Sequence, residues 1–133
     1  MLMVCSLLGC VDCAAAQSAP QTGAEAFILM DAGSGRVLTG KNTEQELAIA
    51  STTKIMTCLV ALEHSELTEK VTVKREHLRE GSSMYLLEGE TLTMEELLYG
   101  LMLPSGNDAA EALADGCGGT ASFVRRMNGL AGE

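Results

Sequence analysis

The chain has 133 residues, of which 47% are hydrophobic and 20% charged, so it is long and apolar enough for one modest packed domain, and this composition argues against wholesale disorder. Its net charge of −9, from 18 acidic and 9 basic residues, argues against a nucleic-acid partner, because phosphate binding needs a concentrated basic surface. Two Phe, two Tyr and no Trp leave no platform on which bases would stack.

The N-terminus has the features of a secretory signal. Residues 1–11 are almost entirely apolar, and Ala14–Ala16 offers a small-residue cleavage site, which predicts a signal peptide over residues 1–16 and a polar linker over 17–24. The positive segment that usually opens such a signal is missing, because the first basic residue is Arg36. The apolar run is too short to span a bilayer. Lipidation at Cys10, in a Leu-Leu-Gly-Cys box, is the weaker alternative. We expect an exported protein.

Two cysteines, Cys58 and Cys117, lie outside this leader. Export would allow them to pair, but two distant cysteines establish no disulfide, and Cys58 reads as a small core residue of a helix. The sequence contains no Cys or His spacing typical of a metal site, so we expect neither metal nor cofactor.

The pattern of elements begins with a hairpin. Two short apolar runs, residues 26–30 and 36–39, flank the Gly-rich turn 31–35, which predicts two antiparallel strands.

Helices dominate the rest of the chain. Residues 51–63 form the strongest predicted helix, and its apolar side chains cover nearly every side, which predicts burial all round. A short strand is predicted at 71–73. A capping box, Thr93 to Glu96, opens a second helix that runs to Leu103. Two further helices are predicted at 107–114 and 120–130, the last with a stripe of Phe123, Met127 and Leu130.

Lys54 is the residue that local rules do not explain. It stands in the first turn of a helix with no other charge between Ser51 and Leu62, where both burial and the helix dipole disfavour an ammonium. Ser51 lies three residues earlier, on the same helical face. A serine hydroxyl needs a base to become nucleophilic, and a desolvated lysine can be that base. However, Ser-x-x-Lys occurs by chance in roughly one chain in two of this length, with the serine as an N-cap and the lysine in solvent.

A second cluster lies in the turn after Pro104. Ser105 and Asn107 stand between two predicted helices, where a hydroxyl can relay a proton and a carboxamide can hold a substrate amide. An ordinary helix N-cap explains the same residues equally well.

The two clusters together resemble a known family. Residues 50–57, Ala-Ser-Thr-Thr-Lys-Ile-Met-Thr, and 105–110, Ser-Gly-Asn-Asp-Ala-Ala, are similar to the first two motifs of the D-alanyl-D-alanine carboxypeptidases, which are low-molecular-mass penicillin-binding proteins. Residues 81–90 resemble the segment that the family carries between these motifs, and the hairpin resembles its opening strands. The resemblance covers roughly residues 24–130.

The resemblance implies an α+β fold of the β-lactamase/transpeptidase type, an antiparallel sheet packed on a helical region, with residues 25–133 as the N-terminal part of that catalytic domain. It implies Ser51 as acylated nucleophile, Lys54 as general base, Ser105 as proton relay and Asn107 as substrate contact. The substrate would be a peptidoglycan stem peptide ending in D-Ala-D-Ala, and β-lactams would acylate the same serine. The backbone N–H of Ser51 would be one oxyanion donor.

The sequence departs from the family in lacking its third motif, a Lys-Thr-Gly triad that supplies the second oxyanion donor and a cation for the substrate carboxylate. We expect that motif beyond residue 133, with the family's later strands and its C-terminal membrane-associating helix. The hairpin would then keep an unpaired apolar edge.

Two alternatives remain open. A class A β-lactamase-like hydrolase usually carries Asp where this chain has Gly106, so the glycine favours the carboxypeptidase. A non-catalytic cell-wall-binding module would fit the absent third motif but not the intact Ser51, Lys54, Ser105 and Asn107. A triad built on His64 or His77 is disfavoured, because both histidines lie in polar segments and are expected on the surface.

From the absent motif we predict that these 133 residues alone are marginally stable and inactive. The measurement is labelling by a fluorescent penicillin, and a purified chain that retains label at Ser51 would refute the prediction.

Overall fold

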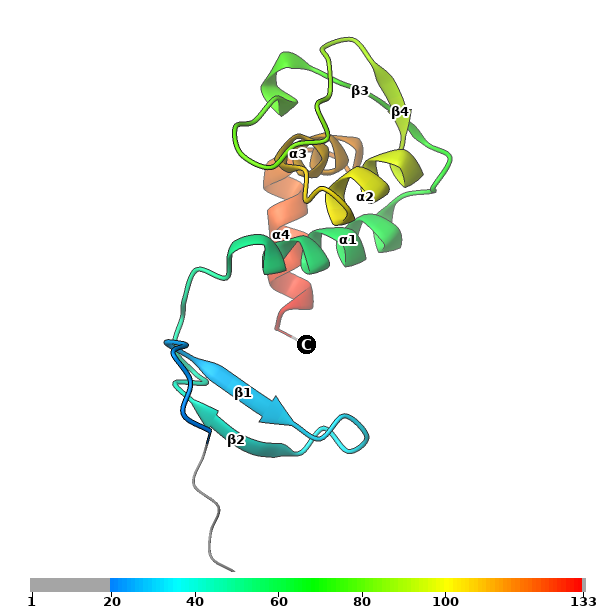
Figure 1. Cartoon of the computed structure of the whole chain (residues 1–133). Helices are drawn as coiled ribbons and strands as arrows, with labels where there is room; N and C mark the ends of the chain where they lie inside the picture. The colour runs from blue at the N-terminus through cyan, green and yellow to red at the C-terminus, as the bar shows by residue number, and fades with distance from the viewer. Residues whose placement is uncertain (1–19, 133) are drawn as a thin grey trace, which may run out of the picture. The chain divides into compact units, whose positions relative to one another are not determined.

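The computed structural model describes residues 20–132, which divide into two compact units with the boundary between Leu47 and Ala48 (Figure 1). The predicted signal peptide and the first part of the predicted linker lie outside the described residues. Residues 20–24, the rest of that linker, form neither helix nor strand.

The first unit is the predicted hairpin. Strand β1 (Phe27–Met30) pairs antiparallel with β2 (Val37–Lys41), in a register that runs from Phe27 opposite Lys41 to Met30 opposite Val37, with an irregularity after Leu29. Gly35, at φ 70°, donates its N–H to the Asp31 carbonyl at 2.9 Å and closes the turn. A left-handed backbone angle explains why glycine stands there.

The hairpin is apolar but poorly covered. Within the described residues its two strands pair only with each other. About half the surface of five large apolar side chains is exposed: Ile28, Leu29, Met30, Val37 and Leu38. This agrees with the expected unpaired apolar edge.

The second unit is mainly helical. It contains α1 (Thr53–His64), α2 (Met94–Met102), α3 (Asn107–Gly116) and α4 (Thr120–Leu130), with short 3-10 turns at Ala50–Thr52 and Arg75–His77. Strands β3 (Lys70–Thr72) and β4 (Thr91–Thr93) form a small antiparallel sheet. In Figure 1, α1 and α2 lie side by side, and contacts join α3 to α2 and α4 to both α1 and α3.

One continuous core holds this unit together. Its members come from all four helices, from β3, from the segment between β3 and β4 and from the end of α3. The fully buried large ones are Val60, Val73, Met94, Leu97, Leu101, Leu113 and Phe123. Met127 and Leu130 pack against it from α4, which confirms the predicted stripe. Cys117 is buried and Cys58 half-buried against the core, and both are free thiols. No helix within residues 20–132 has the length and apolar character needed to cross a membrane.

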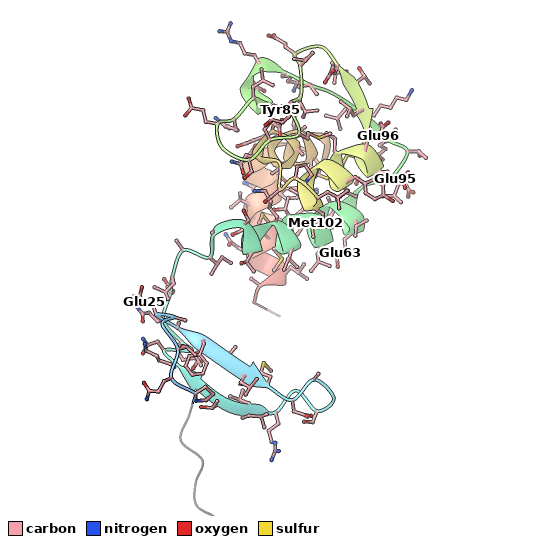
Figure 2. All side chains as sticks on the ribbon, viewed as in Figure 1. Glu25, Glu63, Tyr85, Glu95, Glu96 and Met102 are labelled. Carbon is pink, nitrogen blue, oxygen red and sulfur yellow. The ribbon has the colours of Figure 1, made fainter. Side chains whose placement is uncertain are left out.

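The predicted all-round burial of the first helix is wrong. Thr57, Val60 and Ala61 are buried, but Ile55, Leu59 and Leu62 are about half exposed. The reason is that α2, α3 and α4 all pack on the inner side of α1, so its other side is uncovered within the unit. The remaining helix boundaries agree with the prediction to within about two residues, and the capping box of Thr93 and Glu96 is present; the side chains of Glu95 and Glu96 are shown in Figure 2.

The expected surface position of His77 is also wrong, whereas His64 is exposed as predicted. Only 2% of His77 is accessible. Its Nδ1 accepts the backbone N–H of Lys74 at 3.1 Å, so the neutral ring carries its proton on Nε2, which faces a carboxylate oxygen of Asp115 at 3.5 Å. The same oxygen lies 2.7 Å from Lys74 Nζ. A metal would need a bare Nε2, so this ring does not fit a metal ligand.

Candidate active site

The structure joins the two sequence clusters through one hydrogen bond. Lys54 Nζ donates to Asn107 Oδ1 at 2.7 Å, although the two residues are 53 positions apart. Lys54 stands in the first turn of α1 and Asn107 is the first residue of α3. Both side chains are half-buried. The charge that looked misplaced in α1 therefore has a polar partner on another helix.

Two hydrogen bonds besides that to Lys54 hold Asn107. Its side-chain Nδ2 donates to the Glu80 carbonyl at 2.9 Å, and its backbone N–H donates to the Ser82 carbonyl at 2.7 Å. These partners fix which end of the amide faces Lys54, because a carbonyl can only accept and an ammonium can only donate. One hydrogen of Nδ2 and one lone pair of Oδ1 remain for another partner.

Ser51 lies in the 3-10 turn that leads into α1 and is exposed. The residue before it, Ala50, has φ 47°, a left-handed angle that costs an alanine about 1–2 kcal/mol. Such angles persist where surrounding structure enforces them, often at functional sites. Within residues 20–132 no hydrogen bond joins Ser51 to Lys54, whose Nζ bonds to Asn107 instead.

Ser105 occupies the turn between α2 and α3, and it also has a left-handed angle, φ 60°. The N–H of Gly106 donates to the Gly100 carbonyl at 2.9 Å, which pins the turn to α2. A Cβ on Gly106 would lie 2.9 Å from that carbonyl and 2.8 Å from Asp108 Oδ1, so the backbone leaves no room for a side chain. Ser105 makes no hydrogen bond to Lys54 or Ser51 in the described part of the chain.

Beneath the turn lies a buried carboxylate, Asp108, of which 1% is accessible. Four groups donate to it: Ser83 Oγ at 2.6 Å and the backbone N–H groups of Met84, Leu86 and Ala109 at 2.9–3.1 Å. Burial alone would raise the pKa of Asp108, but the Ser83 hydroxyl and then the three N–H groups outweigh it, so the pKa is lowered from 3.8. The carboxylate stays charged and satisfied.

A groove of about 420 Å³ lies beside Asn107. Apolar residues of α3 and α4 line it together with Arg79, Glu80 and Glu111, and Arg79 Nε lies 3.0 Å from Glu111 Oε1. Asn107 lines it, but Ser51, Lys54 and Ser105 are not among its lining residues.

Comparison with known proteins identifies the family of this chain. The family model of the D-alanyl-D-alanine carboxypeptidases matches residues 13–133, nearly the whole chain. The chain belongs to the D-alanyl-D-alanine carboxypeptidase family. The resemblance stated from the sequence is thereby confirmed.

Individual relatives agree. The chain is 40% identical over 126 residues to the D-alanyl-D-alanine carboxypeptidase DacC of Escherichia coli, covering 85% of this chain and 32% of the relative. A crystal structure of a D-alanyl-D-alanine carboxypeptidase from Mycobacterium tuberculosis superposes with a TM-score of 0.80 at 35% identity, covering 90% of this chain and 46% of the other. A mutant of the Streptomyces K15 DD-transpeptidase gives a TM-score of 0.76 at 37% identity, over 85% and 49%.

These matches confirm the predicted fold class, the α+β transpeptidase-like fold. They also show that the chain spans between about a third and a half of the length of its relatives. The carboxypeptidase relatives therefore fix the family and the fold of this part.

The sequence predicts Ser51, Lys54, Ser105 and Asn107 as site residues but gives Asp108 no role. An acidic residue in the first turn of a helix is ordinary, because the helix dipole favours it there. Nothing local to Asp108 signals that its carboxylate is buried or that three of its four donors lie more than 20 residues away.

The packing around Gly106 predicts that Gly106→Ala lowers the free energy of unfolding by about 1–3 kcal/mol, because the added Cβ meets backbone atoms that cannot move aside. Gly129→Ala is the matched control: nothing lies within 4 Å of its Cβ position, so the alanine raises helix stability by about 0.5–1 kcal/mol. Urea unfolding of both variants measures the difference, and equal effects would contradict the packing argument.

The lowered pKa of Asp108 predicts a pH dependence of stability. A depressed folded-state pKa contributes stability that is present above the ordinary pKa of 3.8 and is lost as the pH falls through the folded value. Wild type should therefore exceed Asp108→Asn in unfolding free energy by most at neutral pH and by progressively less below about pH 4. Urea titrations at stepped pH test this, and a constant difference would contradict it.

Proposed function

We propose that the complete gene product containing these residues is a serine-type D-Ala-D-Ala carboxypeptidase that removes the terminal D-Ala from peptidoglycan stem peptides. The observation that carries the proposal is the 2.7 Å hydrogen bond from Lys54 Nζ to Asn107 Oδ1, since it brings the two family motifs together from different helices. Family membership supports the same reaction.

In the proposed reaction Ser51 is the nucleophile and Lys54 its base. A neutral amine keeps its N–H bonds, so Lys54 can go on donating to Asn107 while its lone pair accepts the Ser51 proton. Ser51 Oγ attacks the carbonyl carbon of the penultimate D-Ala. The resulting oxyanion accepts a hydrogen bond from the backbone N–H of Ser51, which lies at the N-terminal end of α1.

Breakdown of this intermediate needs a proton for the leaving amine. We assign the relay to Ser105, whose hydroxyl can accept from the protonated Lys54 and donate to the amine nitrogen as the terminal D-Ala departs. Water then hydrolyses the ester on Ser51, with Lys54 again as base, and the shortened stem peptide leaves. The free Nδ2 hydrogen of Asn107 is the proposed contact for the substrate amide oxygen.

The family's Lys-Thr-Gly motif would complete this site with a second oxyanion donor and a cation for the substrate carboxylate. We propose export to the extracytoplasmic face of the cell membrane, after cleavage of residues 1–16, with residues 25–133 as the N-terminal part of the catalytic domain. β-Lactams, as analogues of the D-Ala-D-Ala end, would acylate Ser51.

The β-lactamase-like alternative is disfavoured by Gly106. The aspartate usual at this position in class A enzymes would place a side chain where a Cβ alone meets Gly100 O at 2.9 Å and Met84 N at 3.2 Å. The backbone of this turn is therefore built for glycine.

The test is Ser51→Ala in the complete gene product, because removing the hydroxyl removes the bond-forming atom. We expect loss of covalent labelling by a fluorescent penicillin and loss of D-Ala release from a stem pentapeptide, a decline of at least about a thousandfold. Ser122→Ala, on α4 and outside the site, is the control and should label normally.

Three other results would contradict the proposed function. Labelling by penicillin that survives in Ser51→Ala would show that Ser51 is not the nucleophile. Rapid turnover of penicillin without D-Ala release would indicate the hydrolase. Stem-peptide binding without acylation in wild type would indicate the non-catalytic cell-wall-binding module.

A further inference from the structure

We propose that Asp108 is a positioning residue for catalysis, which sets the orientation of the Asn107 carboxamide, and so of the Lys54 amine, through the loop of residues 80–86. The inference rests on the proposed function for its catalytic consequence. The structural coupling that it describes is independent of that function.

The first step is the hold of Asp108 on the loop. Three of its four donors belong to the loop: the Ser83 hydroxyl and the N–H groups of Met84 and Leu86. The Ser83 oxygen also accepts the N–H of Tyr85 at 2.8 Å, so the carboxylate organises consecutive residues of the loop. Hydrogen bonds to a charged acceptor in a dry environment are the strongest that a loop can use.

The second step is the hold of the loop on Asn107. The carbonyls of Glu80 and Ser82 accept from the Nδ2 and the backbone N–H of Asn107. Between them Gly81 has φ 95°, and a Cβ there would lie 2.9 Å from Asn107 Nδ2. The loop backbone therefore lies directly against the carboxamide, with no room for a side chain between the two.

The third step leads to Lys54. Because Glu80 O holds Nδ2, the opposite atom Oδ1 is presented to Lys54 Nζ at 2.7 Å. A loop released from Asp108 frees the carboxamide to turn, and Lys54 loses the acceptor that directs its amine. A displacement of about 1 Å at a reacting group can cost about a hundredfold in rate.

Burial alone does not explain the choice of aspartate. The carboxylate receives four donors. An asparagine would retain one oxygen, but its NH2 group would face N–H donors, which cannot accept a hydrogen bond from it. Asp108→Asn therefore preserves shape but breaks the loop contact, and Ser83→Ala removes one of the four donors while leaving the charge in place.

The experiment measures coupling and catalysis separately in the complete gene product. Amide hydrogen exchange reports the Asn107 N–H, with the N–H of Val60, in the core of α1, as the monitor of global opening. Ser83→Ala should speed exchange at Asn107 at least tenfold relative to Val60, and Asp108→Asn should speed it further. Two matched controls, Asp115→Asn later on α3 and Ser65→Ala after α1, should change it less than threefold.

The catalytic readout is the rate constant for acylation by penicillin, measured separately from the dissociation constant of the initial complex. We expect Asp108→Asn to lower the rate constant about a hundredfold and Ser83→Ala about three- to tenfold, with initial binding changed less than threefold. A purely structural role for Asp108 would lower the folded fraction but leave this rate constant, per folded molecule, unchanged.

Exchange at Asn107 that stays within threefold of wild type in Ser83→Ala, or that moves only in step with Val60, would overturn the coupling. If Asp108→Asn fails to fold, Ser83→Ala alone decides. If wild type is not acylated at all, the proposed function fails while the exchange data still confirm or reject the coupling.

Discussion

The buried carboxylate of Asp108 is the constraint on which the rest of the site depends. A charge almost wholly removed from water is tolerated only when its lone pairs are satisfied, and here four donors converge on it. That requirement fixes the path of the loop 80–86, and the path fixes where its carbonyls point. The buried carboxylate also explains why position 106 must stay small, since a Cβ there would crowd Asp108 Oδ1. The path of the loop, the need for a small residue at position 106 and the setting of the α3 N-terminus therefore all follow from the burial of one carboxylate.

Much of the fold can be predicted from the sequence because its signals are local. The Gly-rich turn indicates the hairpin, the Thr93–Glu96 capping box indicates α2, and an apolar stripe with helical spacing indicates α4. Strand β4 was not predicted, since its three residues are a strand only through pairing with β3, about 20 residues away. His77 was placed on the surface for the same reason: its charged neighbours in sequence say nothing of the packing that buries it.

The candidate site was readable to a different depth. Lys54 drew attention because it violates the expectations for a helix N-terminus, and Asn107 because it resembles a motif. Their hydrogen bond supplies what neither observation contained, a physical reason for the two motifs to occur in one chain. Asp108 stayed invisible because an acid at that helical position already satisfies local rules. A residue that obeys every local preference gives no hint of its long-range contacts.

The left-handed backbone of Ala50, directly before Ser51, bears on how such a chain tolerates change. Glycine would adopt that angle at little cost, whereas the alanine stores strain. Selection for thermal stability alone would relieve that strain by exchanging the alanine for glycine. Such selection would act on a side chain that carries no reactive atom, one residue before the proposed nucleophile.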